Sequence, residues 1–66
     1  MNKEEIIKLL IETAQITYRK KMKTATEADM ARDKELYFLM KTIHQDTTWK
    51  EAYAEFGRMP RQNGEW

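Results

Sequence analysis

The sequence predicts a small all-α domain, and three observations support this prediction. The 66-residue chain has no glycine or proline between Met1 and Phe56, so nothing there interrupts a helix. Apolar residues recur at helical spacing, and three helix-start signatures precede them. We expect one domain over residues 1–66, with helices near 3–22, 27–45 and 48–56. The two long helices should form a hairpin, followed by the short third helix and an extended or flexible C-terminal tail over 57–66.

The first predicted helix begins at Asn2, whose side chain can accept a hydrogen bond from the backbone near Glu5. On a helical wheel its apolar residues cover about 240°, far more than the ~100° stripe of an ordinary surface helix. They are Ile6, Ile7, Leu9, Leu10, Ile11, Ala14, Ile16, Tyr18 and Met22. Two companion helices could hardly bury so wide a face, so we expect a homodimer, most simply a two-fold one through the first two helices.

The second predicted helix begins at Thr26, with Asp29 as its capping partner. It contains the densest apolar stretch of the chain, residues 36–40, for which a buried strand is the alternative to a helix. Leu36, Leu39, Met40 and Ile43 should form one buried stripe, with Tyr37 at its flank. Phe38 falls on the opposite, polar side of the wheel. It is either a singly exposed apolar residue or a contact for a partner protein.

The third predicted helix is short and starts at Thr48, with Glu51 as its capping partner. It carries the clearest amphipathic pattern, because apolar side chains follow the spacing i, i+3, i+4 and i+7. This stripe consists of Trp49, Ala52, Tyr53 and Phe56, and it should pack in the core. We expect Gly57 to provide a left-handed cap and Pro60 to prevent the helix from continuing.

The predicted tail mixes apolar and cationic side chains without a packing period of its own. Met59 and Trp66 are its large apolar residues, and Arg58 and Arg61 flank Met59. Together with Phe38, these four residues are the predicted partner-binding set.

A basic cluster ends the first helix, formed by Arg19, Lys20, Lys21 and Lys23. These cations can complement the negative end of the helix dipole and remain solvated. Alternatively they contact phosphate, which makes a small DNA- or RNA-binding protein the second functional hypothesis. The net charge of only +1 gives no general attraction to nucleic acid.

Other functional classes find no support in the composition. The chain has no cysteine and one histidine, His44, so we expect no disulfide, metal site or cofactor. No nucleophile with a matched base and no phosphate-binding loop is present, so we expect no enzyme. No apolar stretch approaches the ~20 residues of a membrane span, and we expect a cytoplasmic protein. The sequence therefore favours a small non-enzymatic protein-binding or regulatory module, with another protein as partner.

Overall fold

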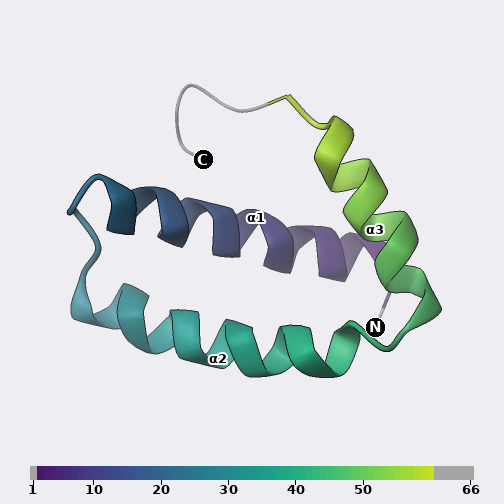
Figure 1. The fold of residues 1–66 in the computed structure, drawn as a ribbon, viewed down its shortest axis with the longest axis horizontal. Helices are drawn as coiled ribbons and strands as arrows, with labels where there is room; N and C mark the ends of the chain where they lie inside the picture. Colours follow the sequence, from purple (N-terminus) through teal and green to yellow (C-terminus); the bar gives the residue numbers. More distant parts are fainter. Residues whose placement is uncertain (1, 61–66) are drawn as a thin grey trace.

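A computed structural model of the chain describes residues 2–60, and these residues form three helices and no strand. The helices are α1 (Lys3–Lys21), α2 (Glu27–Ile43) and α3 (Thr47–Arg58). The predicted all-α class is confirmed, and each helix lies within two residues of its predicted limits. Figure 1 shows α1 and α2 side by side and running in opposite directions, with α3 turning back over the N-terminal end of α1.

Two of the three predicted helix starts are correct. The Asn2 side chain accepts a hydrogen bond of 2.9 Å from the backbone N–H of Glu5. Thr26 and Asp29 form a reciprocal capping box, with distances of 3.1 Å and 3.0 Å. Each cap satisfies backbone N–H groups that have no partner inside the helix.

The predicted cap at Thr48 is wrong, because α3 begins earlier. Asp46 is the N-cap residue, and its side chain accepts a hydrogen bond of 2.9 Å from the backbone N–H of Thr48. Aspartate is a better N-cap than threonine. The earlier start also adds a helical residue to an element too short to be stable by itself.

The predicted left-handed cap at Gly57 is also wrong. Gly57 lies inside α3, which continues to Arg58 and ends at Met59 in an extended conformation. The residue before a proline is driven towards extended backbone, so Pro60 accounts for the end of the helix without help from glycine.

A left-handed residue instead follows α1, at Lys23, whose φ is 61°. The backbone N–H of Lys23 donates to the carbonyl of Lys20 at 3.1 Å, and that of Thr24 donates to the carbonyl of Arg19 at 2.8 Å. This pair of bonds is a Schellman motif, in which the left-handed position is usually occupied by glycine. The turn between α1 and α2 therefore depends on a lysine in an unfavourable backbone conformation.

The main core lies where α3 packs on the N-terminal half of α1. Its buried residues are Ile6, Leu10, Ile43 and Ala52, and partly buried apolar residues surround them: Ile7, Leu9, Met40, Trp49 and Phe56. α3 contacts α1 more extensively than α2 does. The predicted packing of the third helix on the body of the domain is therefore correct.

The other end of the α1–α2 pair has few buried side chains and several ion pairs. Ile16 and Leu36 are buried there. The guanidinium of Arg32 donates two hydrogen bonds to Glu12, at 2.7 Å and 3.0 Å. Arg19 bonds Asp29 in the same bidentate way, at 3.0 Å and 2.9 Å. Lys20 and Asp33 add a third pair at 3.0 Å.

The three helices form a single thin layer. The Cα positions extend 34 Å and 26 Å along the two longer axes but only 14 Å along the shortest. The radius of gyration is 12.1 Å, against about 11 Å for a compact chain of this length. Most domains build their core between two packed layers. This one has a single layer, and only six apolar residues of the described chain are buried.

Candidate protein-binding surface

Three consecutive large apolar side chains lie on the outer surface of α2. Phe38 is 66% exposed, Tyr37 60% and Leu39 36%. Phe38 lies on the opposite side of α2 from the buried Leu36, as the helical wheel predicts. The Tyr37 and Phe38 rings make an edge-to-face contact at 5.8 Å. Lys41 places its ammonium 5.3 Å from the centre of the Tyr37 ring.

A shallow hollow lies beside Phe38, between α2 and the start of α3. Six residues line it: Glu35, Phe38, Leu39, Thr42, Ile43 and Asp46. Its exposed lining is mostly apolar, and none of the six residues carries a positive charge. The backbone N–H of Thr48 lowers the pKa of Asp46, so this carboxyl group is ionised at neutral pH.

Two residues expected in the core are instead exposed. The helical wheel predicts Leu39 in the buried stripe of the second helix, but Leu39 lies at the edge of that stripe and lines the hollow. The apolar spacing predicts Tyr53 in the buried stripe of the third helix, but Tyr53 is 55% exposed. Its ring contacts Trp49 at 5.7 Å, and Trp49 in turn lies 5.5 Å from His44. α2 and α3 each pack against α1. One neighbouring helix covers only part of an apolar stripe, so the residues at the edge of each stripe stay exposed.

The run of apolar residues at 36–40 was the available signal for Tyr37 and Leu39. Five consecutive apolar residues span far more than one helical face. Some of them must therefore be exposed, and the sequence does not show which of the five the neighbouring helices cover.

The other members of the predicted partner-binding set lie away from Phe38 or outside the described residues. Arg58 is exposed at the end of α3, and Met59 is half-buried beside it. Arg61 and Trp66 fall outside residues 2–60. The C-terminal end of α3 lies on the opposite side of α1 from α2 (Figure 1). Phe38 and the start of the tail therefore do not form one continuous surface.

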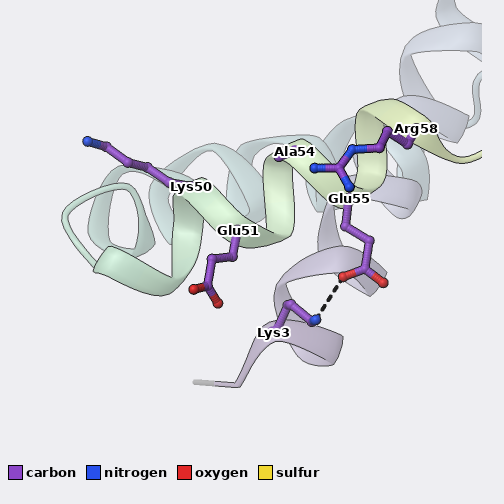
Figure 2. Close-up of a pocket in the computed structure, with 6 residues that line it drawn as sticks. All are labelled: Lys3, Lys50, Glu51, Ala54, Glu55 and Arg58. Atoms are coloured by element: carbon purple, nitrogen blue, oxygen red, sulfur yellow. Dashed lines mark ion pairs between the residues drawn. The ribbon is translucent and has the colours of Figure 1, made fainter.

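A second hollow, on the outer side of α3, is lined by charges of both signs (Figure 2). Lys3 from α1 forms an ion pair of 2.9 Å with Glu55, and this contact raises the pKa of Lys3. Figure 2 shows Arg58 above Glu55, while Lys50 points away from the pair. Since the charges are mixed and one pair is already formed, this hollow favours no ligand of a particular charge.

The basic end of α1 is partly used inside the fold. Arg19 and Lys20 pair with Asp29 and Asp33 of α2. Lys21 and Lys23 are exposed and form no ion pair within residues 2–60. The nucleic-acid hypothesis stays a prediction, and half of the cations on which it rests have acidic neighbours.

One stripe of α1 lies on the side of the helix away from α2. Ile11, Ala14 and Tyr18 follow the spacing i, i+3 and i+7, and on a helical wheel they lie roughly opposite Ile16, which is buried between α1 and α2. All three are half-buried. This stripe is the part of the wide apolar face that α2 does not cover.

Neither the described side chains nor the comparisons with known proteins point to another kind of site. Within the described chain, no three acidic or histidine side chains gather in a way that could hold a metal ion. None of the three helices is long and apolar enough to cross a membrane. No protein-family model, no curated protein and no solved structure matches the chain.

Proposed function

We propose that this chain is a small, non-enzymatic protein-binding or regulatory module whose principal contact is the outer surface of α2. The observation that carries the proposal is the exposure of Tyr37, Phe38 and Leu39 on one helix, beside an apolar hollow. Large aromatic side chains with little covering structure are the usual anchors of protein interfaces. The partner presents an apolar segment to this surface.

Substitution of Phe38 tests the proposal once the partner has been captured from the native host and identified by mass spectrometry. Phe38→Ala should weaken the affinity for the purified partner by ~2 kcal/mol or more, the scale of an interface hot spot. The free energy of unfolding should change by less than the ~3–5 kcal/mol of an emptied core site, because Phe38 is exposed. Calorimetry and urea denaturation measure the two quantities.

Tyr53→Ala is the matched control, because Tyr53 is an aromatic residue of similar exposure on another helix. Its substitution should leave the affinity unchanged. Equal losses of affinity in the two variants would mean that the partner does not bind specifically at Phe38. A strongly destabilised Phe38→Ala protein with intact binding would mean that Phe38 supports the fold. Arg58, Met59, Arg61 and Trp66 stay a predicted second contact.

We also propose that α1 and α2 act as one helical hairpin and that two hairpins associate about a two-fold axis. The half-buried stripe of Ile11, Ala14 and Tyr18 supports a contact through α1. The thin layer supports it independently, because a second copy would supply the missing layer.

A further inference from the structure

We infer that the hollow on α2 takes an amphipathic segment that carries basic residues, and that a second copy of this chain is not its occupant. This inference rests on the proposed function, since it names the chemistry of the partner for the same surface. It follows from the charges that line the hollow and from their positions at its two ends.

The floor of the hollow is apolar and its two ends are acidic. Phe38, Leu39 and Ile43 provide the apolar part. Glu35 lies within α2 at one end, and Asp46 lies at the other, eleven residues later in the sequence and three residues after α2 ends. An apolar strip with an anion at each end is complementary to a segment with apolar side chains between two cations.

The cations of this region lie away from the hollow or are already engaged. Arg32 donates a hydrogen bond of 3.1 Å to Glu35 but also holds Glu12 of α1. The Glu35 side chain remains 65% exposed after this contact. Lys41 lies over the Tyr37 ring, on the other side of Phe38. Asp46 forms no side-chain ion pair within residues 2–60, so both ends of the hollow can accept a cation from a partner.

Charge also argues against the same hollow of a second copy. If two copies pair in opposite directions about the centre of the hollow, Glu35 of one lies level with Asp46 of the other. If they pair in the same direction, each carboxylate lies level with its counterpart. Both arrangements bring carboxylates close together, and no cation lines the hollow to offset their repulsion, so both are unfavourable. The proposed dimer therefore leaves this hollow open.

Two designed helical peptides test the inference with the full chain. Each has about 18 residues, or about 27 Å as a helix, with leucines at spacing i, i+3 and i+7 to contact the apolar part of the hollow. The basic peptide has lysines eleven residues apart, flanking the leucines, and its twin has glutamates at those two positions. We expect the basic peptide to bind about tenfold more tightly than the twin, and this preference to weaken with added salt.

Variants locate the source of the preference. Glu35→Gln with Asp46→Asn removes both charges, and asparagine keeps the helix cap of α3. This double variant should bind the two peptides about equally. Glu51→Lys makes the same change in net charge on the exposed outer side of α3 and should keep the preference. Calorimetry measures each affinity, and circular dichroism checks that every variant remains helical.

The outcomes separate this inference from the proposed function. Equal binding of the two peptides to the unmodified chain, lost in Phe38→Ala, would overturn the basic preference while the α2 surface stands. Equal weakening by Glu51→Lys and by the double variant would reduce the effect to net charge and overturn the inference. Binding of neither peptide, or dimers that Phe38→Ala dissociates, would likewise overturn it, and the Phe38→Ala affinity for the native partner would still decide the proposed function.

Discussion

Lys23 carries the least favourable backbone conformation in the described chain, because its φ of 61° is left-handed. An L-residue pays about 1–2 kcal/mol for this conformation, whereas glycine adopts it freely but loses more entropy on folding. We expect Lys23→Gly to raise the free energy of unfolding by about 0.5–1 kcal/mol. Urea denaturation followed by circular dichroism measures the change.

Lys21→Gly is the control for Lys23→Gly, because it removes the same charged side chain two residues earlier. Lys21 is the last residue of α1, and a glycine in a helix costs up to ~1 kcal/mol. The two substitutions should therefore have opposite signs. A loss of stability in both would show that the Lys23 side chain matters more than its backbone conformation.

At the residue scale the sequence predicts what local chemistry decides and misses what neighbouring helices decide. Asn2 and Thr26 were identified as caps because a cap depends on a few adjacent residues. Asp46 and Thr48 are both good N-cap residues and lie only two positions apart, so the sequence did not decide which of them begins α3. The exposure of Leu39 depends on how much of the surface of α2 the other two helices cover, and the residues around Leu39 do not determine this.

The α1–α2 pair should weaken in acid, because ion pairs supply much of its contact. Hydrogen bonds from Arg32 lower the pKa of Glu12 below its ordinary value of 4.5, and those from Arg19 lower that of Asp29 below 3.8. The unfolded chain therefore binds more protons than the fold as the pH decreases below about 5, and stability is lost there. The contribution is complete at neutral pH. Thermal unfolding between pH 7 and pH 3 measures the loss.

Glu12→Gln should flatten this pH dependence and lower the thermal midpoint at pH 7, since the amide keeps the size of the side chain but not its charge. Glu51→Gln should leave both nearly unchanged, because Glu51 is exposed and forms no ion pair within the described chain. High salt should also lower the midpoint of the unmodified protein. A midpoint that is constant from pH 7 to pH 3 would mean that these pairs add nothing to stability.

At the element scale the helices were predictable and their partners were not. The absence of glycine and proline up to Phe56, together with polar caps, set three helices to within two residues. The apolar spacing of α3 also indicated correctly that it packs on the body of the domain. The pairing of Arg32 with Glu12 joins residues twenty positions apart, and the sequence offers several equivalent cations and acids for such a contact.

At the scale of the whole molecule, the chain exposes more surface than a compact monomer of its size. The accessible area is 5179 Å², against about 4450 Å² expected for a folded chain of 8.0 kDa. The excess of about 700 Å² is what a single layer of helices produces, because one layer leaves apolar side chains uncovered that a second layer would bury. The wide apolar face of α1 already predicts from the sequence that apolar surface remains uncovered in a single copy. The sequence does not show that the helices lie in one layer.

We therefore expect the full chain to sediment as a dimer of about 16 kDa, twice its 8.0 kDa, at high micromolar concentration and to dissociate on dilution. Ile11→Glu should shift the protein to monomers, because a carboxylate in the half-buried α1 stripe cannot be buried without a partner charge. Thr17→Glu adds the same charge at an exposed position of α1 and should leave the dimer intact. Circular dichroism must show full helicity for both variants. A fully helical monomer of the unmodified chain at several hundred micromolar would rule out the dimer, and the α1 stripe would then belong to the contact with another protein.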